Sequence, residues 1–125
     1  MKLTFTKSIL NAVRKAQVIG IKAGKYPHRV IAVWAVVVKN RVYIRSWSLS
    51  NHSWYTAFRE NPIGELHISG RKILIRPVFV RSEPLKAEVS AAYAEKYHTA
   101  GSARFVKEMS GRKSRNTTTG LVPLR

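Results

Sequence analysis

The sequence predicts a mainly β protein, a small and mostly antiparallel β-barrel with helices packed around it. Runs of β-branched and apolar residues recur between turn residues, which is the pattern of strands. Most connections between these runs are short enough for hairpins, and hairpins give antiparallel pairing. The 125 residues, of which 45% are hydrophobic, provide for one modest core, and a twisted sheet of this size tends to close on itself. We therefore expect one domain over residues 1–125.

The first half of the chain is expected to form a helix and about three strands. Thr6 can cap a helix whose apolar residues recur at helical spacing. The segment RVIAVWAVVV is β-branched and apolar on both faces, which indicates a central strand covered on both sides. Lys39–Asn40 is a two-residue connection, and asparagine tolerates a left-handed turn. The expected elements are a helix over residues 6–18, an extended piece over 18–28, the central strand over 29–38 and its return strand over 41–47.

The second half is expected to alternate helices with strands. Ser50 is a good N-cap, and Trp54 and Phe58 share one face of the helix that would follow it. Gly70–Arg71 has the pattern of a type II′ turn between two strands, and Pro84 suits the first position of a helix. The expected elements are a helix over 51–60, strands over 65–69 and 72–81, a helix over 84–97, a polar segment with a short helix over 103–109, and an edge strand over 121–124.

The charge of the chain is strongly positive. It has 23 basic and 6 acidic residues, a net charge of +17, and residues 1–59 contain no acidic residue. Such a field attracts anions, so nucleic acid, a phosphorylated cofactor and another anionic small molecule are all candidate partners. The scarcity of carboxylates disfavours magnesium sites.

The sequence gives little support to metal or hydrolytic chemistry. Cysteine is absent, and the four histidines lack the paired spacing of zinc ligands. The chain has no G-x-S-x-G elbow, no Walker loop and no G-x-G-x-x-G motif. The N-terminus lacks the apolar core of a signal peptide, and the longest apolar run has nine residues, too short to cross a membrane. We expect a cytoplasmic protein with no bound metal and no membrane partner.

The stretch RSWSLSNHSWY, residues 45–55, is the best candidate for a ligand site. It lies between a strand and a helix, where hydroxyl groups and unpaired backbone N–H groups favour phosphate. Arg45 can supply a fork of donors, and Asn51 and Ser53 lie in the first turn of the expected helix. The alternative is that Ser50 caps the helix and the other serines only fill a loop.

The middle of the chain resembles the flavin split-barrel proteins, the pyridoxamine-phosphate-oxidase-like superfamily. The shared layout is a strand, a turn, VYIRS, a polar loop, a Trp-containing helix ending in ENP, and two strands around a glycine turn. Within that superfamily, AAYAEKY (91–97) and TTTGLVP (117–123) resemble motifs of an uncharacterised domain-of-unknown-function family. The segment from Ser46 to Gly70 is also similar to the deazaflavin-dependent nitroreductases.

The resemblance implies a split β-barrel that forms a homodimer and binds FMN or a deazaflavin between subunits. By that resemblance, the cofactor phosphate would be held by basic and hydroxyl residues of the first long strand and of the loop after VYIRS. The matching positions are Arg29, Arg45, Ser46, Ser48, Ser50 and Asn51. With Ser53, from the first turn of the expected helix, they are the candidate cofactor-binding residues.

Three hypotheses for function remain open at the level of sequence. The first is a flavin- or deazaflavin-binding protein, which as an enzyme would be an oxidoreductase, with no catalytic residue nominated. The second is a basic nucleic-acid-binding module, suggested by the charge. The third is a non-catalytic barrel that binds another anionic small molecule.

Overall fold

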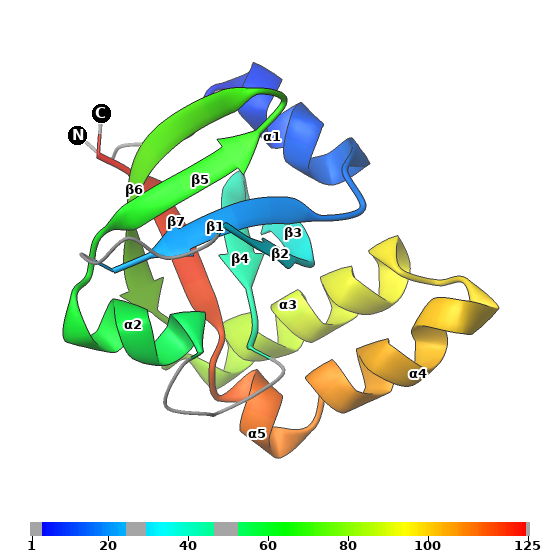
Figure 1. The fold of residues 1–125 in the computed structure, drawn as a ribbon. Coiled ribbons are helices and arrows are strands. Elements are labelled where there is room, and N and C mark those ends of the chain that lie inside the picture. The colour runs from blue at the N-terminus through cyan, green and yellow to red at the C-terminus, as the bar shows by residue number, and fades with distance from the viewer. Residues whose placement is uncertain (1–3, 25–29, 47–52, 125) are drawn as a thin grey trace.

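A computed structural model describes residues 4–24, 30–46 and 53–124. Within these ranges the chain forms five helices and seven strands, in the order α1, β1–β4, α2, β5, β6, α3, α4, α5 and β7 (Figure 1). The helices are α1 (Lys7–Lys15), α2 (Trp54–Glu60), α3 (Glu83–Lys96), α4 (Ala100–Met109) and α5 (Arg112–Arg115). The strands are β1 (Ile19–Ala23), β2 (Ile31–Val33), β3 (Ala35–Val38), β4 (Arg41–Ile44), β5 (Gly64–Ile68), β6 (Arg71–Phe79) and β7 (Thr119–Pro123).

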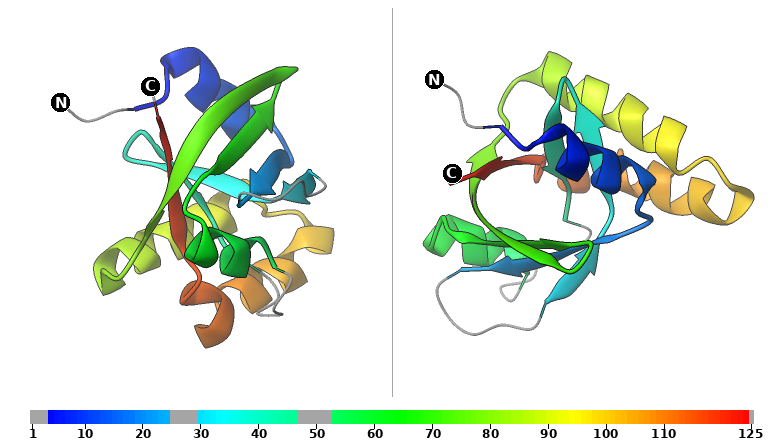
Figure 2. Two further views of the ribbon diagram at one scale, coloured as in Figure 1. Left: turned by 60° about the vertical axis from the view of Figure 1, so that its left-hand side comes forward. Right: turned by 90° about the horizontal axis from the view of Figure 1, so that it is seen from above.

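The described strands form one sheet in the order β2-β1-β5-β6-β7-β4-β3, and all of their pairings are antiparallel. Its two edge strands, β2 and β3, are consecutive in the chain and separated only by Trp34. The sheet therefore curls into a nearly closed barrel, which is visible from above in Figure 2. This confirms the predicted mainly β, antiparallel barrel with peripheral helices.

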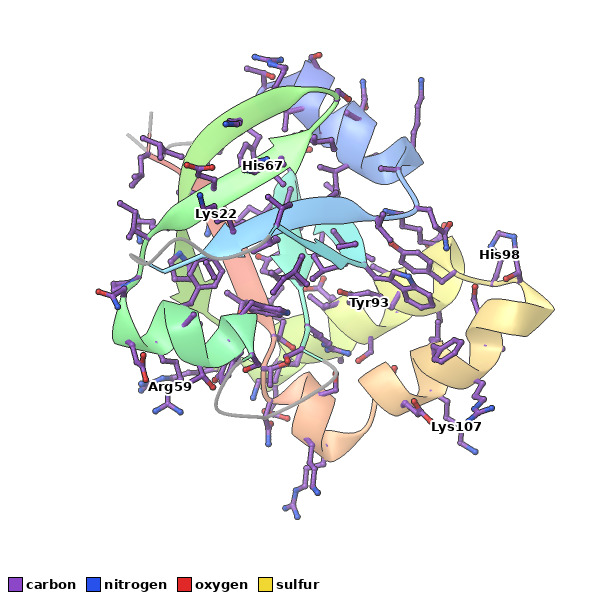
Figure 3. All side chains as sticks on the ribbon, viewed as in Figure 1. Lys22, Arg59, His67, Tyr93, His98 and Lys107 are labelled. Atoms are coloured by element: carbon purple, nitrogen blue, oxygen red, sulfur yellow. The ribbon has the colours of Figure 1, made fainter. Side chains whose placement is uncertain are left out.

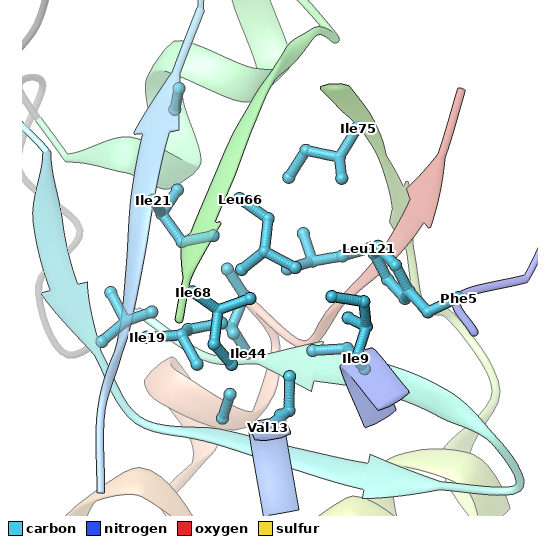
Figure 4. Packing of buried hydrophobic residues seen from close by; sticks show 14 of the residues in the cluster. Phe5, Ile9, Val13, Ile19, Ile21, Ile44, Leu66, Ile68, Ile75 and Leu121 are labelled. Carbon is cyan, nitrogen blue, oxygen red and sulfur yellow. The ribbon is translucent and has the colours of Figure 1, made fainter. Parts of the chain in front are cut away.

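The barrel encloses the main hydrophobic core. Alternate residues of β1 and β5 point inward, as the period of two in a half-buried strand requires. Helix α1 closes one end of the barrel with its buried apolar face, and Thr6 caps it as predicted. Figure 4 shows how these side chains meet: Phe5, Ile9, Val13, Ile19, Ile21, Ile44, Leu66, Ile68, Ile75 and Leu121.

A second, smaller core lies outside the barrel wall. It joins the outward side chains of β3 and β4, Val36 and Tyr43, to the buried face of α3, with Val106 of α4 at its edge. Strand β4 thus contributes to both cores, with Val42 and Ile44 inward and Tyr43 and Arg45 towards α3. Inward and outward side chains therefore alternate along the strand, as the period of two requires.

The predicted central strand over residues 29–38 is wrong in one respect, because the segment divides at Trp34. Strand β2 pairs with β1, whereas β3 pairs with β4 on the other side of the barrel seam. The change of partner leaves backbone groups near Trp34 outside both ladders, and such groups need other partners. The start of β2 is exposed, so the apolar run reflects a strand that closes a barrel and not one buried on both faces.

Side chains of α3 bind the backbone at this seam. The hydroxyl of Tyr93 donates to the Trp34 carbonyl at 2.8 Å, and the Ala35 N–H donates to the hydroxyl of Tyr97 at 3.2 Å. The ring of Tyr97 stacks on Trp34 with a centroid distance of 4.1 Å. Lys96 donates from Nζ to the Val13 carbonyl at 2.8 Å and to the Ala35 carbonyl at 2.6 Å. The AAYAEKY motif therefore fastens the seam of the barrel to α1.

Lys96 gives the fold a testable pH dependence. Burial lowers the pKa of its ammonium group from 10.5 to about 8. Between these values the folded protein binds fewer protons at this group than the unfolded chain, so stability rises with pH. We expect the difference in free energy of unfolding between wild type and Lys96→Met to grow from pH 8 to pH 10.5. Urea denaturation at several pH values measures it, and a difference that stays flat or falls contradicts the assignment.

Turn chemistry is partly as predicted. Lys39 and Asn40 both have positive φ, 51° and 63°, as a two-residue type I′ hairpin requires. The turn between β5 and β6 is Ser69–Gly70, with φ values of 51° and 73°, and not a type II′ turn at Gly70–Arg71. Arg71 instead pairs with Ile68 in the ladder.

Three other elements differ from the prediction. Helix α2 begins at Trp54 with Ser53 as its N-cap, so the predicted cap at Ser50 is wrong. Strand β7 lies between β6 and β4 and is buried along its whole length, so it is not an edge strand. The short helix predicted over 103–109 is confirmed within α4, but α4 begins earlier, at Ala100 with Thr99 as its N-cap, and α5 was not predicted.

Candidate functional site

The candidate site lies where β4 ends, between β7 on one side and the N-terminal half of α3 on the other. Arg45 and Ser46 leave the strand there, and the chain is described again from Ser53. Four of the predicted cofactor-binding residues, Arg29, Ser48, Ser50 and Asn51, lie outside the described residues. The geometry of the site is therefore that of its base, which the structure describes in detail.

Arg45 is the most deeply placed charged residue at this base, with 2% of its surface exposed. Its Nε donates to Thr118 Oγ1 at 2.8 Å, Nη1 donates to Ser90 Oγ at 2.8 Å, and Nη2 donates to the Lys86 carbonyl at 2.7 Å. The guanidinium also lies 5.7 Å from the ring centroid of Tyr93. It joins the end of β4 to α3 and to Thr118, the residue before β7, and the acceptors in these three bonds are neutral.

Ser46 is held by its backbone. Its N–H donates to Thr117 Oγ1 at 2.7 Å, and its carbonyl accepts from Ser114 Oγ at 2.8 Å. Ser114 lies in α5 and Thr117 lies between α5 and β7, both more than 60 residues further along the chain. The start of the serine stretch is thus fixed in position by the C-terminal part of the chain.

The first two threonines of TTTGLVP, Thr117 and Thr118, explain how that C-terminal segment is fixed in turn. Thr117 and Thr118 donate from their hydroxyls to the carbonyls of Ser114 and Arg115, three residues earlier, at 2.6 and 2.5 Å. Each hydroxyl also accepts a hydrogen bond from a residue at the end of β4: Thr117 from the Ser46 N–H and Thr118 from Arg45 Nε. Threonine suits these positions because one hydroxyl both donates and accepts.

Lys86 and Glu83 extend the network to the surface at the start of α3. Lys86 Nζ donates to Glu83 Oε2 at 3.1 Å and to Asn116 Oδ1 at 3.3 Å. Arg115 also donates to the Glu83 carboxylate, and these bonds hold the pKa of that exposed carboxyl below its usual range. Glu83, the acidic residue of this network, is therefore paired with Lys86 and Arg115.

The electrostatics at the base are positive. Burial lowers the pKa of Arg45 to about 10, with Arg115 acting in the same direction, yet the guanidinium stays protonated at neutral pH. Burial also raises the pKa of Tyr93, which keeps that hydroxyl neutral. The base thus carries a fixed positive charge beside neutral hydrogen-bonding groups.

Ser53 lies on the far side of the serine stretch and caps α2. Its Oγ accepts from the Thr56 N–H at 3.2 Å. Trp54 and Phe58 share one face of the helix, as predicted. Both are buried against the barrel core, and their rings meet edge to face at 6.0 Å. These contacts fix the second end of the stretch, so both of its ends are anchored.

Sequence reasoning about the site missed the residues that build its base: Lys86, Ser90, Ser114, Thr117 and Thr118. Spacing gave no signal for them, because they come from α3, from α5 and from the two residues before β7. Two of them belong to TTTGLVP, whose likeness to a family motif was the one available sign.

Within the described residues, no group of three or more His, Asp or Glu side chains could hold a metal ion. Among the described helices, none is long and apolar enough to cross a membrane. The positive charge of Arg45 at the base suits an anionic ligand.

Comparison with known proteins gives a family and a fold. The sequence profile of the family described as "Uncharacterized protein conserved in bacteria (DUF2255)" matches residues 9–121. Among solved structures, the fold is similar to that of conserved hypothetical protein Rv2991 from Mycobacterium tuberculosis. The TM-score is 0.61 and the identity 15%, over 99% of this chain and 84% of that chain. None of the curated proteins matches.

At 15% identity, the likeness to the mycobacterial protein concerns the fold alone. The family profile is more informative, since it spans nearly the whole chain, from α1 to β7. It includes the seam residues of α3 and the threonines that anchor the candidate site. The chain therefore belongs to this family of uncharacterised proteins conserved in bacteria, in agreement with the resemblance seen in AAYAEKY and TTTGLVP.

Proposed function

We propose that the protein binds the phosphate of FMN or of a deazaflavin at the stretch between β4 and α2, and that it serves as an oxidoreductase. The observation that carries this proposal is the buried guanidinium of Arg45 at the base of that stretch, bonded to Thr118, Ser90 and the Lys86 carbonyl. A charge fixed in a low-dielectric site stabilises a nearby anion more strongly than an exposed one does.

The described residues fit a phosphate group in charge, because a buried guanidinium lies at the end of β4. Arg45 would act through its field and by holding Ser46 in place, while the hydroxyls of Ser48 and Ser50 and the side chains of Asn51 and Arg29 would contact the phosphate. A bound flavin or deazaflavin would supply the hydride-transfer chemistry itself. The protein would supply orientation and positive charge.

A cofactor titration tests the serines. We expect wild type to quench FMN fluorescence or to bind a deazaflavin, and Ser48→Ala with Ser50→Ala to raise the Kd at least tenfold. The reason is that a hydrogen bond to a charged group contributes about 1.5–3 kcal/mol, and about 1.4 kcal/mol is tenfold in affinity.

Ser8→Ala is the matched control, because Ser8 is an exposed serine on α1, and it should leave the Kd unchanged. Equal Kd values for wild type and the double variant would remove the serines from the site. Binding of other phosphorylated compounds without preference for a flavin ring would favour the third hypothesis, a barrel for another anionic small molecule.

We also propose that the protein is a homodimer. Support comes from Leu74, which is 55% exposed on the outer face of β6 and lies opposite Glu65 in the ladder. Sedimentation equilibrium should give twice the chain mass of 14.2 kDa, and Leu74→Glu should shift the equilibrium towards the monomer at least tenfold. Ile63→Glu changes another exposed apolar residue and should not. A monomeric wild type at high concentration contradicts this proposal.

A further inference from the structure

A second positive surface lies at the end of the barrel opposite α5. It consists of the outward side of α1 and the tip of the β5–β6 hairpin, which lie side by side in Figures 1 and 2. We call it the α1 patch and define it by its exposed polar residues: Lys7, Ser8, Asn11, Arg14, Lys15, Ser69 and Arg71. Figure 3 shows the side chains of α1 and the hairpin projecting outward here.

The α1 patch contains four basic residues and no acidic one. The six glutamates of the chain lie elsewhere, on α2, β5, α3 and α4. Among the described ion pairs, none involves a side chain of the patch. Arg14 Nη1 donates to Asn11 Oδ1 at 2.9 Å, which holds that guanidinium over the outer face of the helix. The positive charge of the patch is therefore not offset by neighbouring carboxylates.

The shape of the patch suits a chain of phosphates. A shallow hollow runs between the helix and the hairpin, lined by Ser8, Asn11, Ala12, Lys15, Ala16 and Ser69. Two rows of polar residues follow the helix axis, one from Lys7 to Arg14 and one from Ser8 to Lys15. Each row spans about 10 Å at 1.5 Å per residue. Lysine, arginine, serine and asparagine side chains are the usual partners of phosphate oxygens in nucleic-acid complexes.

The residue types of α1 distinguish between three polyanions: a membrane surface, a single-stranded nucleic acid and a nucleic-acid duplex. The apolar residues of α1, Ile9, Leu10 and Val13, are buried in the barrel core, so the helix has no apolar face to insert into a membrane. Helix α1 contains no aromatic residue, so it offers no platform on which single-stranded bases would stack. Binding to the backbone of a nucleic-acid duplex needs neither an apolar face nor an aromatic residue.

We propose that the α1 patch binds the phosphate backbone of double-stranded nucleic acid without reading its sequence. This goes beyond the cofactor site and does not depend on it, since the patch and the Arg45 network share no residue. Each phosphate contact releases counterions, so the logarithm of the binding constant falls with the logarithm of salt by about 0.9 per contact on B-DNA.

The test is fluorescence anisotropy with a labelled 20-base-pair DNA duplex of mixed sequence between 50 and 200 mM salt. The patch variant carries Gln in place of Lys7, Arg14, Lys15 and Arg71. The control variant carries Gln in place of Arg104, Lys107, Arg112 and Lys113, which are exposed on α4 and α5, away from α1. Both variants remove four charges from the net +17, so non-specific attraction is matched.

We expect wild type to bind the duplex at 50 mM salt, and the patch variant to bind at least tenfold more weakly. Its salt slope should be smaller by about 3–4, corresponding to four lost contacts. The control should bind within threefold of wild type, and both variants should keep the FMN affinity of wild type. Equal weakening by the two variants, an unchanged slope, or binding to phosphatidylserine vesicles but not to the duplex would overturn the proposal.

Discussion

Replacing Arg45 with methionine is expected to lower the free energy of unfolding by about 3 kcal/mol, because bonds from a charged donor contribute about 1.5–3 kcal/mol and buried acceptors left unpaired add a penalty. The lost bonds would loosen the end of β4, α3 and the start of β7 together, since the guanidinium binds Ser90 and the Lys86 carbonyl on α3 and Thr118 just before β7. Methionine keeps much of the side-chain volume, so the effect would report the lost bonds more than a cavity. Urea denaturation measures it.

One further variant separates charge from geometry at this position, and a second is a surface control. Arg45→Lys keeps the charge but replaces a planar fork with one ammonium group, so we expect it to recover less than half of the loss. Arg76→Met removes an exposed arginine from β6 and should cost less than about 0.5 kcal/mol, as surface changes usually do. An Arg45→Met protein as stable as wild type would show that the network does not hold the base of the site.

Truncation of Phe58 to alanine should have the largest effect on stability, about 3–5 kcal/mol, the usual cost of removing a buried phenylalanine ring. Phe58 is fully buried and fixes α2 to the barrel. Its ring lies where a side chain on Gly64 would reach, 2.8 Å from an added Cβ. Because residue 64 is a glycine, the Phe58 ring can occupy the position that a side chain of residue 64 would otherwise take.

The same variant tests how the ligand stretch is positioned. If α2 anchors its second end, Phe58→Ala should weaken FMN binding under conditions where the protein is still folded. Tyr55→Phe is the control, because Tyr55 is only half-buried on the same helix, and it should change neither stability nor binding appreciably. A Phe58→Ala protein that binds FMN as tightly as wild type would separate α2 from the site.

The barrel could be predicted from the sequence, whereas the place where it closes could not. Hairpin turns such as Lys39–Asn40 and the alternation in β4 are local signals, and they gave the antiparallel strands correctly. The break at Trp34 depends on partners that are distant in sequence, namely β1, β4 and the side chains of Tyr93 and Tyr97. A continuous β-branched run does not reveal where a strand changes partner.

The site shows the same division. The position of the serine stretch between a strand and a helix was predicted, and Arg45 was named as a candidate. The sequence offered Arg45 as a possible donor to a ligand, but its described bonds run to α3 and to Thr118, the residue before β7. These partners lie 41 to 73 residues away, so no local pattern could identify them. The N-cap shifted from Ser50 to Ser53 because both serines satisfy the same local rule.

The central claim is that the stretch between β4 and α2 recognises a phosphate above the charge of Arg45. Calorimetric titration with FMN and with riboflavin tests it most directly, because the two ligands share the flavin ring and differ by the phosphate. We predict that FMN binds and that riboflavin binds at least tenfold more weakly, with the difference lost in the Ser48→Ala, Ser50→Ala protein. Equal affinity for both ligands, or no binding of FMN at modest salt, would contradict the claim.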